Sequence, residues 1–178
     1  DSVGVDEYRQ VAFVVTRGGV VELYPLERQQ AMAAMPVPAL SGGAVTTVVA
    51  LGKGVYLLGT SDGRTIPLDL KFEVTFGEGG RTVTPRAEFG APRLFDPQRR
   101  RAVLRLTGAS TGGGPLTIAQ IGPAELLVQT IVEKKALIGP STKEESLASM
   151  PIKLDGEITA LRLDGRAEDL FIGTSRGQ

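Results

Sequence analysis

Arg99, Arg100 and Arg101 form the longest basic run of the chain, and they follow Asp96-Pro97-Gln98 directly. An arginine guanidinium can hold a phosphate or a carboxylate through two parallel hydrogen bonds. No aromatic residue stands within this run, so the base-stacking partners that single-stranded nucleic acid needs are missing. We expect a solvated connection that leads into a strand, with contact to an anion or a partner as the alternative function of the three arginines.

The carboxylates show no spacing typical of a metal site or of an acid–base pair. Asp62, Asp69, Glu73, Glu78, Glu88 and Asp96 form no D-x-D-x-D-G pattern. The chain has no Cys and no His, which excludes a Ser–His or Cys–His dyad and a Cys/His zinc site within it. The sequence therefore predicts no catalytic residue, no cofactor and no metal ligand, and we expect a protein that is not an enzyme.

A glycine-rich segment, Thr107–Gly114, is the only candidate for a phosphate-binding loop. Such a loop needs a helix start and a lysine after its last glycine, whereas here Pro115 and a strand pattern follow. A hairpin connection is the favoured interpretation, with an anion-binding nest as the alternative.

Length and charge bound the class of protein. The chain has 178 residues, and its 20 basic and 20 acidic residues balance, so no basic footprint suggests nucleic acid. No apolar run approaches the roughly 18 residues that would span a bilayer. We expect the segment itself to be soluble, although it could belong to a membrane protein.

Strand patterns dominate the elements that would position these residues. Short apolar or alternating runs bounded by Gly, Pro, Asp and Ser are typical of strands. They predict strands at Val11–Thr16, Val20–Pro25, Val45–Leu51, Val55–Ser61, Arg64–Phe76, Arg81–Phe89, Arg101–Thr107, Pro115–Ile121, Glu125–Glu133, Leu147–Lys153, Glu157–Leu163 and Asp169–Ser175. Good helix formers predict helices at Leu26–Ala34 and Thr142–Ala148.

Two stretches of the chain are nearly identical: Leu58-Gly59-Thr60-Ser61-Asp62-Gly63 and Ile172-Gly173-Thr174-Ser175-Arg176-Gly177. Each follows an apolar run and leads into a tight turn, so we predict structural turn roles for Gly59, Asp62, Gly63, Gly173 and Gly177. The glycine at the end of each turn would supply a positive φ, and Asp62 would act through its side-chain acceptor.

First strands of apparent four-stranded units begin near Val45, Arg101 and Glu157, each 56 residues apart (101 − 45 and 157 − 101). Four antiparallel strands repeating at this interval are typical of a β-propeller blade. We therefore predict an all-β, propeller-like fragment, with a β-sandwich as the alternative. The blades would be 8–38 (partial), 45–90, 101–153 and 157–178 (partial), and their open edges predict self-association.

The segment Gly156–Gln178 resembles a WD-repeat-like blade. More narrowly, it resembles the large extracytoplasmic insertion in the extended permease subunits of bacterial phosphate-type ABC transporters. The rest of the chain agrees in character only, and the Trp-Asp and Gly-His marks of true WD40 repeats are absent because the chain has no Trp and no His.

The resemblance implies an accessory domain on the periplasmic side of the inner membrane. Its partners would be the rest of the permease chain or the solute-binding protein, and it would act through protein contacts without catalysis. The alternative is a free-standing WD-like propeller that binds protein partners as a scaffold.

Overall fold

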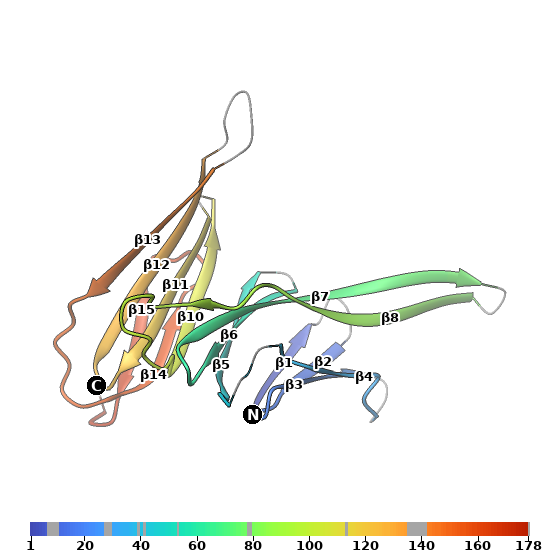
Figure 1. Ribbon diagram of the computed structural model, residues 1–178, viewed down its shortest axis with the longest axis horizontal. Coiled ribbons are helices and arrows are strands. Elements are labelled where there is room, and N and C mark those ends of the chain that lie inside the picture. The colour runs from blue at the N-terminus through green and yellow to red at the C-terminus, as the bar shows by residue number, and fades with distance from the viewer. Residues whose placement is uncertain are drawn as a thin grey trace.

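Strands form all the regular structure in the part of the chain that the structure describes. A computed structural model describes residues 1–6, 11–26, 30–38, 40, 42–52, 54–77, 80–112, 114–134 and 142–177. No helix occurs in these ranges, and the strands form four antiparallel sheets along the chain (Figure 1). The predicted all-β class and the four-stranded antiparallel units are therefore confirmed.

The first three sheets have four sequential strands each, and we call them sheets A, B and C. Sheet A contains β1 (Ser2–Asp6), β2 (Val11–Val15), β3 (Val20–Pro25) and β4 (Ala33–Pro36). Sheet B contains β5 (Val45–Gly52), β6 (Val55–Thr60), β7 (Arg64–Gly77) and β8 (Gly80–Phe89), with β9 (Arg93–Leu94) paired to β7. Sheet C contains β10 (Arg105–Thr111), β11 (Gly114–Gly122), β12 (Glu125–Lys134) and β13 (Thr142–Met150). Sheet D contains β14 (Ile158–Leu163) and β15 (Leu170–Thr174).

Both helix predictions are wrong for the described residues. Thr142–Ala148 lies in β13, which pairs along its length with β12. Ala33 and Ala34 begin β4, while the rest of Leu26–Ala34 is irregular where it is described. In both segments pairing with a neighbouring strand overrides local helix propensity, which amounts to less than about 1 kcal/mol per residue.

The strand predictions missed three elements and misplaced two, since the predicted strand Leu147–Lys153 covers only the end of β13 (Thr142–Met150) and the irregular residues after it. β1 and β4 complete sheet A, so the first unit is not partial, and the short β9 was not expected. The predicted strand Arg101–Thr107 begins later, at Arg105, because the preceding residues form a loop between sheets.

The sheets pack face to face in series, and each junction holds one apolar layer. We call the face that a sheet turns toward the next sheet its front and the opposite face its back. Sheets A and B enclose Phe13, Leu23, Leu58 and Leu68 with their neighbours. Sheets B and C enclose a second layer around Leu57, Phe95, Val103 and Leu106. Sheets C and D enclose a third around Ile118, Leu126, Ile158 and Leu163.

One backbone hydrogen bond recurs at all three junctions. Near its start each new sheet donates an N–H to a carbonyl of the turn between the second and third strands of the preceding sheet. The donors and acceptors are Val45 to Arg17 (3.1 Å), Val103 to Thr60 (3.0 Å) and Ile158 to Pro123 (2.8 Å). Moreover, β10 contacts both β5 and β14, so the first strands of sheets B, C and D lie side by side. This is the propeller-like arrangement that the strand period predicts.

Two hairpins extend beyond the rest of their sheets, namely β7–β8 and β12–β13 (Figure 1). The outer part of β7 is exposed, and Phe76 there is 81% exposed. Among the described residues, no helix is long and apolar enough to cross a membrane.

Candidate functional site

The basic run lies in the loop between β9 and β10, which links sheet B to sheet C. Asp96 shapes this loop: its Oδ1 accepts the backbone N–H groups of Gln98 (3.1 Å) and Arg99 (3.2 Å). Its own carbonyl accepts the N–H of Arg100 (3.1 Å). The Asp96 side chain is only 7% exposed, so these bonds and one ion pair satisfy a nearly buried carboxylate.

Arg101 supplies that ion pair and is engaged within the fold. Its Nη2 lies 3.6 Å from Asp96 Oδ2, and its Nη1 donates to Glu125 Oε2 at the start of β12. The guanidinium therefore joins the loop to sheet C. Its Nε is buried and has no hydrogen-bond partner among the described atoms, which costs free energy and indicates that the two carboxylates determine its position.

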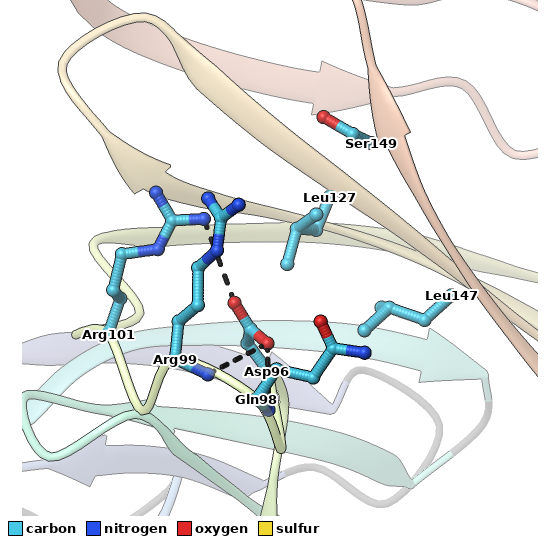
Figure 2. A pocket seen from close by; sticks show the side chains of 7 residues that line it. All are labelled: Asp96, Gln98, Arg99, Arg101, Leu127, Leu147 and Ser149. Atoms are coloured by element: carbon cyan, nitrogen blue, oxygen red, sulfur yellow. Dashed lines mark hydrogen bonds and ion pairs between the residues drawn. The ribbon is translucent and has the colours of Figure 1, made fainter.

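Arg99 borders a pocket of about 250 Å³ between this loop and the strands β12 and β13. Figure 2 shows its guanidinium beside that of Arg101, with Leu127 of β12 and Leu147 and Ser149 of β13 on the other side. The backbone N–H of Arg99 donates to Asp96, but the Arg99 side chain forms no ion pair and no hydrogen bond with a described residue. We call this cavity, lined by Asp96, Gln98, Arg99, Arg101, Leu127, Leu147 and Ser149, the Arg99 pocket.

The three predicted arginines thus differ in what they can do. Arg101 is neutralised internally, Arg99 faces the pocket, and Arg100 is exposed and does not line it. Arg100 also has a positive φ of 48°, a left-handed backbone conformation that residues other than glycine rarely adopt. Of the three arginines, Arg99 alone lines this pocket without an ion pair to a described residue, so it is the one that can receive an anionic group there.

The pocket's apolar wall was not foreseen from the sequence. Leu127 and Leu147 lie on strands that are about 30 and 50 residues away from the basic run, and they reach it because sheet C packs against the loop. The sequence patterns placed Leu147 both in a predicted helix (Thr142–Ala148) and at the start of a predicted strand (Leu147–Lys153), so its position beside the basic run was not predicted. Correct pairing of β13 with β12 would have placed Leu127 opposite Ser149 and brought both near the loop.

The repeated turns make the same hydrogen bonds in sheets B and D. Thr60 accepts the N–H of Gly63 (3.1 Å), and Thr174 accepts that of Gly177 (3.2 Å). Ser61 and Ser175 each bond to the residue before the first strand: each donates its N–H to the carbonyl of Ala44 or Glu157 (2.9 Å in both). In return, each serine Oγ accepts an N–H from that same residue, at 2.9 Å and 3.1 Å.

The glycines of these repeats divide into two kinds. Gly63 and Gly177 end their turns with φ of 85° and 80°, as a tight turn requires. Gly59 and Gly173 are not turn residues, because they lie inside β6 and β15. A Cβ on Gly59 would lie 2.7 Å from Val103, so its small size serves the packing of sheet B on sheet C.

Asp62 acts within its turn, as the sequence suggested. Its Oδ1 accepts the hydroxyl of the buried Thr60 (2.5 Å), and its Oδ2 lies 3.3 Å from Arg64 Nε. The same threonine hydroxyl accepts the N–H of Arg64 (2.9 Å). These contacts hold the Thr60–Arg64 turn together and give Asp62 a structural role.

No group of three or more acidic side chains that could hold a metal ion occurs in the described part of the chain. A second, smaller pocket of about 150 Å³ lies between β1 and β5, and no charged side chain lines it. No protein-family model matches the chain, and no curated protein matches it either.

Proposed function

We propose that this chain is a binding module that recognises another protein and carries out no chemistry of its own. The observation that carries the proposal is the Arg99 pocket, where one uncompensated guanidinium stands opposite an apolar wall of Leu127 and Leu147. An acidic side chain of a partner fits this combination, because its carboxylate can pair with Arg99 while its methylene groups cover leucine.

The specific form of this proposal is an accessory domain of a phosphate-type ABC permease. Its support is the resemblance of Gly156–Gln178 to the extracytoplasmic insertion of that family, together with the propeller-like sheets. In this form the domain lies on the periplasmic side of the inner membrane and contacts the solute-binding protein or its own permease. Sequencing the gene beyond both ends of the chain tests this form of the proposal. We expect one hydrophobic span upstream and several downstream, and a hydrophilic continuation on both sides would contradict the permease assignment.

The Arg99 pocket can be tested with a capped glutamate peptide as the probe, observed through the methyl signals of Leu127 and Leu147. We expect these signals to shift on titration in the parent chain and in Arg100→Gln, which keeps the loop but alters an arginine outside the pocket. We expect no shift in Arg99→Gln, because the charge that pairs with the carboxylate is gone. Equal shifts in both variants would remove the pocket from the proposal.

Inorganic phosphate is the matched comparison ligand. Arg101 is already held by Asp96 and Glu125, so a free phosphate would find a single available guanidinium beside a carboxylate. We expect no phosphate binding by calorimetry. A micromolar interaction that Arg99→Gln abolishes would make the pocket an anion site instead of a protein contact.

A further inference from the structure

Four residues occupy the same place on the second strand of the four sheets, and one of them is uncovered. Phe13, Leu57 and Phe171 each precede by three residues the threonine that begins the next turn, and Ile118 takes the same place on β11. All four lie on the front of their sheets. Phe13, Leu57 and Ile118 are 1%, 8% and 2% exposed beneath the next sheet, whereas Phe171 is 62% exposed.

The residues beside Phe171 on the front of sheet D are also those of a surface that another sheet could cover. Phe171 is paired with Arg162, and Gly173 with Ala160. Gly173 corresponds to Gly59, whose missing side chain makes room for Val103 of the connecting loop and Leu106 of sheet C. The front of sheet D therefore has the form of a surface on which another sheet packs.

The back of sheet A is an apolar face like the backs that a preceding sheet covers elsewhere in the chain. Val14 corresponds to Leu58 of sheet B, since each lies two residues before the turn threonine, and Leu58 is fully buried beneath sheet A. Val14 shares its face with Val3 and Val5, which are 73% and 51% exposed. Backs of sheets B, C and D are covered by the preceding sheet, while the described residues place none over the back of sheet A.

We infer that the front of sheet D binds the back of sheet A from a second copy of this chain, in a head-to-tail contact. The two surfaces are the two halves of a junction that the chain already forms three times within itself. Their charges also complement each other: Arg162 stands on the front of sheet D and Glu22 on the back of sheet A. The inference does not depend on the Arg99 pocket or on the proposed function.

A head-to-tail contact joins two different surfaces, so each copy keeps one free surface for the next copy. This geometry gives a test that a symmetric dimer would fail. Phe171→Lys disables the front of sheet D only, and Val14→Lys disables the back of sheet A only. Each variant retains one intact half of the junction, so the two variants mixed together can form one contact and no more.

Sedimentation of the 178-residue chain over a range of concentrations measures the association. We expect the parent chain to associate, each variant alone to lose about tenfold or more in association constant, and an equimolar mixture to form a 1:1 dimer. Phe76→Lys is the matched control, because Phe76 is more exposed than Phe171 but lies on the β7–β8 hairpin, and we expect it to associate like the parent.

Val5→Lys serves as a second back-surface variant in case Val14→Lys fails to fold, and circular dichroism checks both. A parent chain that stays monomeric at every concentration overturns the inference. So does a mixture of the two variants that remains monomeric, because that result points to a symmetric contact. Loss of association in Phe76→Lys would move the contact to the hairpin and would also overturn it.

Discussion

Sheets B and D contain the same turn in different surroundings. The turns Thr60–Gly63 and Thr174–Gly177 share their sequence pattern and their hydrogen bonds to the residue before the first strand. The turn of sheet B is covered by the loop that leads to sheet C, since Thr60 accepts the N–H of Val103 and Gly63 that of Phe95. The turn of sheet D has no such cover within the described residues. The repeated sequence therefore determines the local conformation of the turn, and the packing around each turn determines how much that turn contributes to stability.

The largest expected difference between the two sheets is at the equivalent residues Leu57 and Phe171. Leu57→Ala removes a side chain buried in the layer between sheets B and C, and we expect a loss of about 3 kcal/mol in the free energy of unfolding. Phe171→Ala alters an exposed residue and should change it by less than about 0.5 kcal/mol. Urea unfolding of dilute, monomeric protein measures both. Equal losses would mean that sheet D is as well covered as sheet B.

A smaller difference is expected at the glycines that end the two turns. Both have positive φ, so alanine costs about 1 kcal/mol in backbone strain at either position. At Gly63 a Cβ would also lie 2.5 Å from the carbonyl oxygen of Arg101, whereas at Gly177 it would meet nothing within 4 Å. We expect Gly63→Ala to cost about 3 kcal/mol in total and Gly177→Ala about 1 kcal/mol.

Urea unfolding under the same conditions measures this pair as well. If Gly63→Ala lowers the free energy of unfolding no more than Gly177→Ala does, the loop at Arg101 can move aside for the new Cβ. In that case this turn does not fix the position of sheet C. Sheets B and D would then differ only in the apolar layers that cover them.

The sequence predicted the repeat because its signals are local. A positive φ favours glycine wherever a tight turn closes, so Gly63 and Gly177 stand out without any knowledge of packing. The succession of four-stranded units was visible for the same reason, although the first strands of sheets B, C and D begin at Val45, Arg105 and Ile158 and not at the equal interval that was predicted. By contrast, Gly59 was assigned to a turn although it is a packing residue, because nothing local distinguishes a glycine that makes room for a neighbouring sheet from one that bends the chain.

The missed elements of the fold and the site depend on distant partners. β13 is rich in helix formers and becomes a strand only by pairing with β12. The Arg99 pocket needs that pairing too, since Leu147 and Ser149 come from β13. The run of three arginines was visible in the sequence, but their division into one engaged, one exposed and one pocket-lining side chain follows from the positions of Asp96 and Glu125.

The smallest expected effect distinguishes the loops before β6 and β15. Asp164 opens the longer loop of sheet D, and its Oδ1 accepts the N–H groups of Glu168 (2.7 Å) and Asp169 (3.2 Å). Partial burial acts to raise the pKa of the Asp164 carboxyl, but the backbone donors of residues 166–169 outweigh it and hold this pKa below its usual value.

A carboxyl whose pKa is lowered in the folded chain contributes stability above its usual pKa and loses it as the pH falls through the lowered value. We therefore expect the amides of Glu168 and Asp169 to lose their hydrogen bonds on acidification in that window, while the loop between β5 and β6 does not respond there. Chemical shifts and amide exchange at these two residues follow the change. In Asp164→Asn the midpoint should disappear, because an amide does not titrate in this range. If the pH midpoint persists in Asp164→Asn, another carboxylate controls the loop, and Asp164 does not distinguish the loop of sheet D from that of sheet B.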